Sequence, residues 1–380
     1  MTEKLYYLDA YVSEFEATVL GCAEENGRFS IRLDRTVFFP NEGGQDADTG
    51  TLDGIPVINV IERDGEIFHI AEAPLPVGAV VRGKIDFPVR YEKMKCHTAE
   101  HILCGIMHRL WGAENVGFHL TDEGVTFDVD VVLSREQLDL AEDMANDIIA
   151  KNVAVSASFP TREELSWLDY RSKLELLENV RLVSIPDCDL CACCAPHVSR
   201  TGEIGLIKML DYFKHRGGTR IFMLAGRRAL YDYRSRYDIA RRISALTSTP
   251  QDKIAEAVEQ LILENEAEKN KNSALLKRIA ELEAEKISTT DNNAVCLLEG
   301  FGADELREVA NIATPRVGGI LVLLSGGEGN YKYVISSGSV DLRRASRDIN
   351  SALNGKGGGR PEMIQGSFYT SLYNIKKYFE

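Results

Sequence analysis

The sequence predicts an α+β protein of several domains: a small N-terminal β-barrel, a mixed α+β domain, a helical linker and a C-terminal α/β domain. Its 380 residues suffice for two or three domains at about 100–200 residues each. Hydrophobic residues make up 44% and charged residues 27%, as in ordinary globular proteins. The pattern of apolar residues also changes along the chain, which places the expected boundaries at residues 1–88, 89–247, 248–288 and 289–380.

The first 88 residues have the pattern of a small barrel or sandwich. Short runs of alternating or β-branched residues are separated by the turn pairs Asp53-Gly54 and Asp64-Gly65. The expected strands include residues 15–20, 29–33 and 57–61. Many short strands at this spacing favour a small closed β-structure.

Helices and strands interleave in the second domain. A long helix is expected over residues 89–110, ending at Gly112. Two later helices should begin at capping boxes, Ser134 with Gln137 and Thr161 with Glu164. Strands are expected near residues 124–132, 153–159 and 180–185, the last leading into a cysteine-rich loop.

A third, helical segment is predicted from about Pro250 to Lys286. Its heptad seam is interrupted by Asn265, Glu268 and Asn272, which argues against a long coiled coil and for a helical linker. A homodimer contact through this linker or the C-terminal domain stays open. Beyond it, strands near residues 294–298 and 320–324 flank a helix near 303–312, a βαβ-like arrangement.

The charge distribution bears on partners. The net charge is −14, which disfavours non-specific nucleic-acid binding. Residues 200–242, however, hold eleven Lys/Arg against four acids, and residues 332–380 hold eight against four. Two local basic patches on an acidic protein indicate that a polyanion binds at those patches, although an ordinary solvated surface would explain them equally well. With no signal-peptide pattern and no long apolar run, we expect a cytoplasmic protein without membrane contact.

Two histidines in the first long helix form half of a metal site. His97 and His101 are four residues apart, so they differ by only about 40° around the helix. An apolar stripe lies roughly opposite, at Ile102, Leu103, Ile106 and Leu110. Because the histidines stand off that stripe, they offer zinc a usable pair of ligands.

A cysteine-rich run supplies the other half. Residues 187–197 contain four cysteines and His197, a density that packing alone explains poorly in a reducing compartment. In one arrangement the run closes on itself, with Cys188, Cys191, Cys194 and His197 holding zinc. In the other, Cys193 and His197 complete a site with His97 and His101. The spacing does not decide between them.

The order of these motifs resembles the editing domain of alanyl-tRNA synthetase. His-x3-His is followed about ninety residues later by Cys-x3-His and then by a characteristic continuation over residues 198–205. The glycine-rich stretch 39–50, Phe127-Asp128 and the run 357–367 resemble further family motifs, the last in a DHH-associated domain. The resemblance covers nearly the whole chain. The chain shows neither the synthetase's alanine-activating domain nor a P-loop. The resemblance therefore implies a free-standing editing protein of the AlaX type in its long form.

The resemblance implies a trans-editing hydrolase that deacylates mischarged tRNA(Ala), with Ser-tRNA(Ala) as the first expected substrate and Gly-tRNA(Ala) as the second. It selects His97, His101, Cys193 and His197 as ligands of Zn²⁺. A non-catalytic tRNA-binding module with structural zinc is the alternative.

Further residues are candidates for catalysis and substrate binding. Glu100, between the two histidines, resembles the glutamate of a zinc-protease helix and is a candidate general base, although its place on the helical wheel suits a surface residue or a support of the metal ligands equally well. The family resemblance makes His119 or Thr121 a candidate reader of the serine hydroxyl. The bare backbone of Gly43-Gly44-Gln45 is expected to approach the aminoacyl group, and Arg360 with its glycines to contact a tRNA phosphate. The chain departs from the family at residues 193–197, Cys-Cys-Ala-Pro-His, where Cys-Gly-Gly-Thr-His is usual; this adds a thiol beside the metal.

Overall fold

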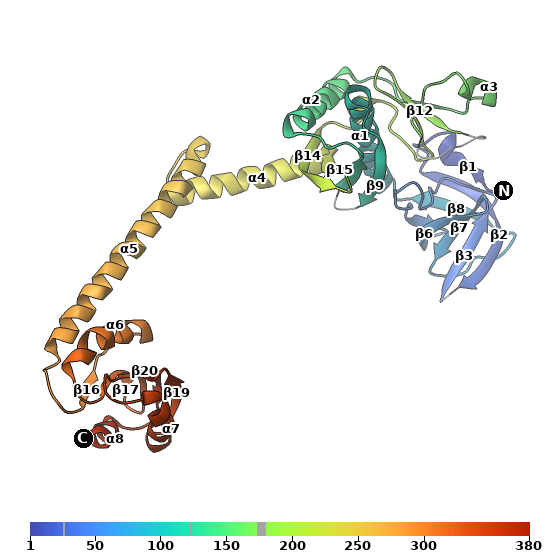
Figure 1. The fold of residues 1–380 in the computed structure, drawn as a ribbon. Coiled ribbons are helices and arrows are strands. Elements are labelled where there is room, and N and C mark those ends of the chain that lie inside the picture. The colour runs from blue at the N-terminus through green and yellow to red at the C-terminus, as the bar shows by residue number, and fades with distance from the viewer. Residues whose placement is uncertain (26, 122–123, 173–179) are drawn as a thin grey trace. The chain divides into compact units, whose positions relative to one another are not determined.

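The computed structural model describes residues 1–25, 27–121, 124–172 and 180–380 (Figure 1). It confirms a mixed α+β protein of more than one domain. The chain separates into two compact units, Met1–Ile239 and Ala240–Glu380, and helix α4 (Gly226–Thr247) runs across the boundary between them. The finer division at residues 88, 247 and 288 stays a prediction. Among the described residues, no helix combines the length and apolar character that a membrane crossing requires.

A closed six-stranded barrel begins the first unit, with strand order β2-β3-β7-β6-β5-β8. Its hairpins turn at Asp53-Gly54 and Asp64-Gly65, where all four residues have positive φ, as two-residue hairpin turns require. The strands are β2 (Glu14–Glu25), β3 (Arg28–Leu33), β5 (Gly50–Leu52), β6 (Ile55–Arg63), β7 (Glu66–Ala71) and β8 (Val80–Ile85). A short parallel pair, β1 (Glu3–Lys4) and β4 (Arg35–Thr36), lies outside the barrel order.

Helix α1 (Phe87–Trp111) is the centre of the rest of the first unit. It has proline in its first turn and ends at Gly112, whose φ is +63°. Every residue from Lys93 to Met107 is buried, so both faces of the helix are covered. The predicted apolar stripe is buried through Ile106, but Leu110 is 41% exposed, because the last turn extends beyond the core.

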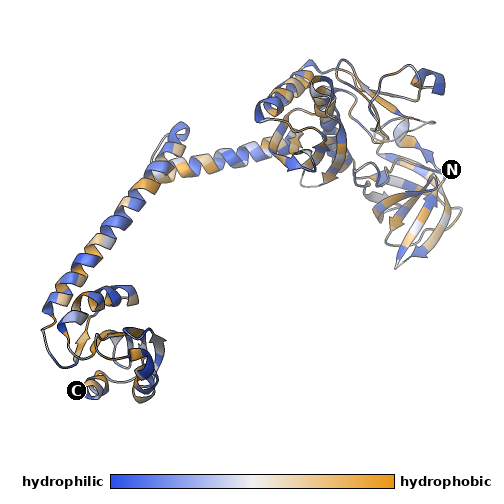
Figure 2. Cartoon of the chain, viewed as in Figure 1, coloured by the Kyte–Doolittle hydropathy of each residue, from blue (hydrophilic) through white to orange (hydrophobic). Residues whose placement is uncertain are grey.

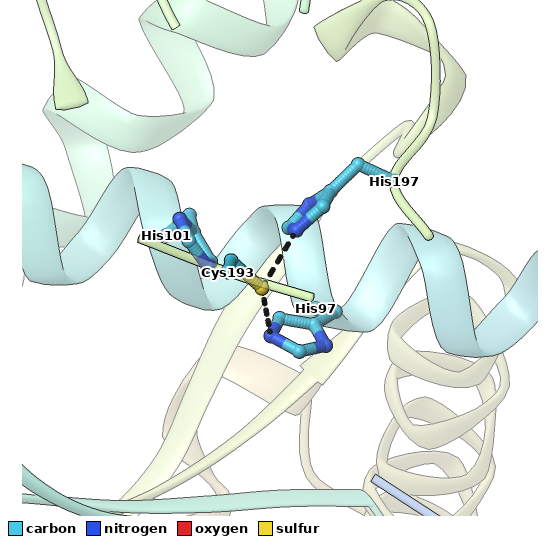
Figure 3. Close-up of side chains that lie close together, drawn as sticks. All are labelled: His97, His101, Cys193 and His197. Atoms are coloured by element: carbon cyan, nitrogen blue, oxygen red, sulfur yellow. Dashed lines mark hydrogen bonds between the residues drawn. The ribbon is translucent and has the colours of Figure 1, made fainter. Parts of the chain in front are cut away.

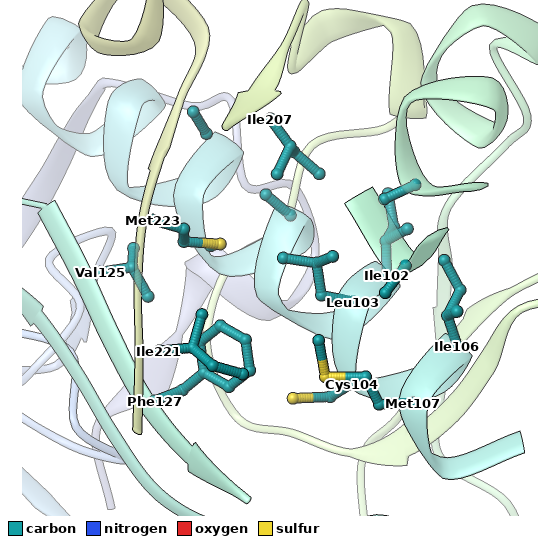
Figure 4. Close-up of a cluster of buried hydrophobic side chains, with 14 of the residues drawn as sticks. Ile102, Leu103, Cys104, Ile106, Met107, Val125, Phe127, Ile207, Ile221 and Met223 are labelled. Atoms are coloured by element: carbon teal, nitrogen blue, oxygen red, sulfur yellow. The ribbon is translucent and has the colours of Figure 1, made fainter. Parts of the chain in front are cut away.

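One face of α1 packs on a four-stranded antiparallel sheet of order β14-β15-β10-β9 (Figure 4). Ile102 and Leu103 of the helix share this core with Phe127 and Ile221 of the sheet. The strands are β9 (Asn115–Thr121), β10 (Gly124–Val129), β14 (Ile207–His215) and β15 (Gly218–Ala225). Burial of these side chains fixes the rotation of the helix relative to the sheet. It therefore also fixes the direction in which the opposite face of the helix points.

That opposite face lies beside a smaller sheet of order β11-β12-β13. The sheet consists of β11 (Ser156–Ser158), β12 (Leu182–Ile185) and β13 (Asp189–Ala192). Strand β13 falls within the cysteine-rich run, which was expected to be a loop. Two helices begin at the predicted capping boxes, α2 (Arg135–Lys151) at Ser134 and α3 (Arg162–Leu165) at Thr161.

The second unit contains a five-stranded sheet of order β16-β17-β18-β20-β19. The strands are β16 (Ala294–Leu297), β17 (Leu321–Gly327), β18 (Asn330–Ser336), β19 (Gly355–Gly359) and β20 (Met363–Phe368). Strands β16 and β17 are parallel and joined through α6 (Ala303–Ala313), which is the expected βαβ unit. The other helices are α7 (Leu342–Ala352) and α8 (Leu372–Phe379).

The predicted linker helix is α5 (Ile254–Lys286), which starts later than expected because a 3-10 turn, Gln251–Lys253, comes first. Hydrophobic and hydrophilic residues alternate along it (Figure 2). Ala280 and Ala284 at its end pack against α6. Most of its other apolar side chains are exposed, including Leu261 and Leu275.

Candidate metal centre

Four side chains from two distant segments meet on the face of α1 that lies opposite the four-stranded sheet (Figure 3). His97 and His101 stand one turn apart on the helix, and Cys193 and His197 follow β13. Their ligand atoms all lie within 4.8 Å of one another. Cys193 Sγ lies 3.3 Å from His197 Nε2 and 3.6 Å from His97 Nε2. Three imidazoles and one thiol in such a group form a donor set that suits zinc.

Two of the imidazoles are oriented by side chains from outside the helix. His97 Nδ1 lies 2.9 Å from Oε1 of Gln45, which comes from the loop before β5. His101 Nδ1 lies 2.9 Å from Oδ2 of Asp189, at the start of β13. Since both partners accept hydrogen bonds through oxygen, each Nδ1 carries the proton and each Nε2 keeps its lone pair.

The third imidazole is oriented by α1 itself. His197 Nδ1 lies 3.0 Å from the hydroxyl of Thr98, and that hydroxyl donates to the carbonyl of Met94 at 2.8 Å. The hydroxyl donates its one proton to Met94, so it must accept the hydrogen bond from Nδ1 of His197. Nε2 of His197 is therefore the unprotonated nitrogen. All three imidazoles are therefore in the tautomer that ligates a metal through Nε2.

Burial acts on the protonation of the group. It lowers the pKa of His197, and the neighbouring His101 and His97 lower it further. Neutral imidazole is the ligating form. Burial also raises the pKa of Cys193, so the thiol would have to give up its proton when it binds a metal.

Asp189 links the group to a buried arginine. Burial raises the pKa of the Asp189 carboxyl, but hydrogen bonds from His101 and Arg171 outweigh it and lower the pKa to about 2. Arg171 Nε and Nη2 approach the two carboxylate oxygens at 2.7 and 2.9 Å. The sequence analysis did not predict this role for Asp189, although its place between Cys188 and Cys191 indicated that it lies near the metal-binding candidates.

The remaining cysteines do not gather around His197. Among the described residues, the second group that could share an ion is His101, Asp189 and Cys191. Cys188 lies 3.5 Å from the carbonyl of Ile102. Neither Cys188 nor Cys194 joins a group of three, so the arrangement in which the run closes on itself is not formed here.

A cavity of about 420 Å³ opens beside the four side chains. Its wall includes His97, His101 and Cys193 from the group, together with Glu100, Asn115 and Phe118. This volume suits a ligand of small-molecule size.

Glu100 faces this cavity, although its place on the helical wheel suggested a surface residue equally well. Its carboxylate is buried and accepts hydrogen bonds from Asn115 Nδ2 and from the Cys104 thiol, the latter at 3.1 Å. The Asn115 amide holds one oxygen in place. A buried carboxylate beside a metal group can take a proton from water.

The two proposed readers of serine do not reach the cavity. Successive side chains of a strand point to opposite faces. On β9, Phe118 is buried and its ring lies 4.7 Å from that of His97, whereas His119 and Thr121 are exposed on the other face. Strand parity therefore corrects the prediction for His119 and Thr121. Asn115 also lines the wall with Phe118, because the β9–β10 pairing shifts register between Asn115 and Gly117 and interrupts the alternation there.

The glycine loop acts differently from the expectation. Gly43 lines the cavity, but Gln45 is wholly buried and contacts His97 instead. Gly44 has a φ of +82°, and a Cβ there would lie 2.2 Å from the carbonyl oxygen of Phe118. The loop therefore needs glycine for close approach to β9, where Leu120 N donates to Gly44 O.

Arg360 lies in the second unit and is exposed. The glycines before it do not form a turn or a phosphate-binding nest, because they make the extended edge strand β19 and none has a positive φ. Gly357 and Gly359 permit close approach to β20, since added Cβ atoms would lie 2.3 Å from its carbonyl oxygens. Arg360 stays a surface cation at the end of this strand.

Known proteins resemble both the site and the full length of the chain. Residues 180–221, which contain Cys193 and His197, match the family described as the threonyl and alanyl tRNA synthetase second additional domain. The alanyl-tRNA editing protein AlaX-L of Pyrococcus horikoshii is 28% identical over 96% of this chain and 94% of its own length. The chain is similar to AlaX-L along nearly the whole length of both proteins. The expected family resemblance is thereby confirmed.

The chain matches nearly all of AlaX-L but only part of the alanine–tRNA ligases that it resembles. The alanine–tRNA ligase of Halobacterium salinarum is 33% identical over 88% of this chain, but the chain spans only 38% of that ligase. Among solved structures, the C-Ala domain of Aquifex aeolicus alanyl-tRNA synthetase aligns with 24% of this chain and 91% of its own, at 21% identity and a TM-score of 0.22. That score is too low to establish a shared fold.

Proposed function

We propose that this protein is a zinc-dependent aminoacyl-tRNA deacylase that hydrolyses mischarged tRNA(Ala) in the cytoplasm. Ser-tRNA(Ala) is the first expected substrate and Gly-tRNA(Ala) the second. The observation that carries the proposal is the convergence of three Nε2 atoms and one thiol beside a cavity that also holds a buried carboxylate, Glu100. Homology to AlaX-L supplies the substrate class.

Hydrolysis of an aminoacyl ester requires a water molecule, a group that takes its proton and support for charge on the carbonyl oxygen. Bound zinc would act as a Lewis acid or bind the substrate's amino group. Glu100 is the general base of this proposal, because its carboxylate lines the cavity within the metal-binding helix. Asn115 fixes that carboxylate by donating from Nδ2 to Oε1, which also accepts from Cys104; Oε2 would then be the oxygen that takes the proton.

Discrimination against alanine would come from polar groups of the cavity. Asn115 is a polar side chain of the wall, and Phe118 is an apolar one. A site that bonds the serine hydroxyl leaves a polar group unpaired when alanine binds, at a cost of about 1–3 kcal/mol. Glycine is smaller than alanine, so size cannot exclude it.

Most of the tRNA would lie outside a cavity of this size. The eight Lys/Arg residues in 332–380, Arg360 among them, are suited to phosphate contacts by the second unit. Binding through phosphates should weaken steeply with salt. Pairing of two chains through α5 or the second unit stays a prediction.

The decisive experiment compares deacylation of Ser-tRNA(Ala), Gly-tRNA(Ala) and Ala-tRNA(Ala) by the full chain as purified, after chelation and after zinc is restored. We expect cleavage of the seryl ester, sparing of the alanyl ester, loss on chelation and recovery with zinc. Equal cleavage of all three would indicate a general deacylase, and activity that survives complete metal removal would refute the zinc requirement.

A second function is favoured by one specific observation. Four protein side chains could ligate one zinc, and a full set of four protein ligands is typical of structural rather than catalytic zinc. The protein would then be a tRNA-binding module without hydrolysis. One zinc per chain with tRNA binding but no cleavage of any of the three esters would establish this alternative.

A further inference from the structure

One buried arginine of the cavity wall forms no ion pair with any described side chain. Arg181 is 9% exposed and lines the same cavity as the four metal-binding candidates. Among the residues that the structure describes, no carboxylate lies within ion-pair distance of it. A buried guanidinium without a counter-charge is unfavourable unless it meets an anion.

Two arginines of the first unit, fully buried Arg90 and Arg171 with its side chain 9% exposed, show the usual solution. Arg90 is completely buried and pairs with Asp48. Arg171 lines the same cavity as Arg181 and pairs with Asp189. Arg181 differs from both. Glu42, Glu100 and Glu114 also line the cavity, but neither they nor any other described carboxylate forms an ion pair with Arg181.

Arg181 uses only part of its hydrogen-bonding capacity. Its Nη1 donates to the carbonyls of Cys193 and Ala195, both at 2.9 Å. Its Nε is buried, and among the described residues neither Nε nor Nη2 has an acceptor. The guanidinium lies 5.4 Å from the ring centre of Tyr7, which also lines the cavity. The edge formed by Nε and Nη2 is the one that binds an oxyanion through two parallel bonds.

We propose that Arg181 binds the last phosphodiester of the RNA substrate, the one that joins the 3′-terminal nucleoside to its neighbour. This inference rests on the proposed function. In an aminoacylated RNA, one ribose separates the 3′ ester from that phosphate. Since Arg181 bonds the backbone of Cys193 itself, an ester at the metal group brings the phosphate into the same cavity.

Holding the loop of Cys193 is the competing role, and it accounts for only one of the three guanidinium nitrogens. It does not explain why no described carboxylate pairs with Arg181, as Asp48 pairs with Arg90 and Asp189 with Arg171. A phosphate contact accounts for the unused Nε and Nη2 atoms and for the lack of an acidic partner among the described residues.

The test is a binding measurement with an uncharged RNA hairpin that ends in a single-stranded CCA tail. The matched probe carries a neutral methylphosphonate at its last linkage, and a third RNA carries it within the duplex. For the unmodified protein we expect the terminal replacement to weaken binding about tenfold, as for one charge-assisted contact. The duplex replacement serves as the control for general phosphate contacts.

The same RNAs are then bound to Arg181→Gln and Arg181→Lys, with zinc content measured for each variant. We expect Arg181→Gln to bind the terminal methylphosphonate and the unmodified hairpin equally, with an intermediate penalty for Arg181→Lys. If Arg181 had only a structural role, its substitution would weaken the binding of both RNAs in parallel, and the terminal methylphosphonate would still lower the affinity of the variant.

An unchanged penalty in the variants, or no penalty in the unmodified protein, overturns the inference and leaves the proposed function intact. Failure of the unmodified protein to bind any RNA overturns both. If Arg181→Gln loses its zinc, Arg181→Lys carries the comparison, and its penalty must then be smaller than that of the unmodified protein.

Discussion

His101 donates from Nδ1 to the carboxylate of Asp189 across 2.9 Å, and both side chains are at least 95% buried. The pair joins α1 to β13, two elements that are far apart in the sequence. A carboxylate on the second nitrogen of an imidazole fixes the ring and raises its basicity toward a metal. The first prediction concerns this contact.

Replacing Asp189 by Asn should lower zinc affinity about 10–100-fold, because the amide carries no charge to support His101. Competition with a chromophoric chelator at fixed pH measures the affinity. Asp187→Asn is the matched control, since Asp187 is exposed and belongs to no metal-binding group. Equal affinities of the two variants would remove Asp189 from this role.

Glu100→Gln should reduce the rate of ester hydrolysis by about 10²–10⁴-fold while zinc content stays constant, as loss of a general base does. Glutamine retains an oxygen that accepts from Asn115 and Cys104, so the fold should persist. Single-turnover deacylation measures the rate. Glu114→Gln is the control, because Glu114 lines the same cavity but is 49% exposed; a comparable loss there would argue against a special role for Glu100.

Gly44→Ala should destabilise the first unit and weaken zinc binding together. The added Cβ would meet the carbonyl of Phe118, and the displaced loop would withdraw Gln45 from His97. Gly54→Ala has the same type of backbone, with φ of +81°, but open space around the added atom. We expect about 1 kcal/mol for Gly54→Ala and at least twice that for Gly44→Ala in chemical unfolding. Equal effects would mean that the close approach is unimportant.

Thr121→Val and His119→Ala should change the serine-to-alanine ratio less than twofold, within the range of exposed substitutions. Both side chains lie on the outer face of β9, away from the cavity. The ratio of single-turnover rates on Ser-tRNA(Ala) and Ala-tRNA(Ala) provides the measurement. A tenfold change in either variant would show that the strand presents its other face to the substrate.

The barrel should lose stability in mild acid. His69 is completely buried, and burial lowers its pKa from 6.5 to about 4. Below pH 6.5 the unfolded chain takes up a proton that the folded barrel refuses until about pH 4, so stability falls as the pH decreases through this window. Between pH 7 and pH 5 the loss should be about 2 kcal/mol.

Amide hydrogen exchange of the barrel strands, corrected for intrinsic rates, measures this stability at the two pH values. His69→Gln has no proton to gain, so its stability should be independent of pH by comparison. The imidazole is held by Thr36 at 2.8 Å and by the carbonyl of Ile31 at 3.1 Å. The same pH dependence in His69→Gln would assign the loss to other groups.

Local patterns predicted much of the fold. The capping residues Ser134 and Thr161 begin helices because their side chains satisfy free amides of the first turn, a purely local effect. The spacing of His97 and His101 likewise follows from helix geometry alone. Wherever the cause lay within a few residues, the pattern was sufficient.

The parts that the sequence did not predict depend on contacts between distant segments. Gln45 reaches His97 across 52 positions, and nothing near Gln45 indicates that partner. The outward direction of His119 is set by the register of β9 in its sheet, since a shift of one residue would exchange the two faces. Asp189 entered a strand because β12 pairs with it, although its cysteine neighbours resembled a loop.

The separation of the metal-binding candidates along the chain has a consequence for biosynthesis. The histidine pair of α1 leaves the ribosome almost a hundred residues before His197, and the oxygen acceptors of its rings lie on both sides of it, at Gln45 and Asp189. During that interval the nascent chain exposes two imidazoles with neither the thiol nor the supporting carboxylate. Selective loading with zinc must therefore wait until the chain has been translated past residue 197, and a ribosome that stalls earlier yields a fragment with only half of the site.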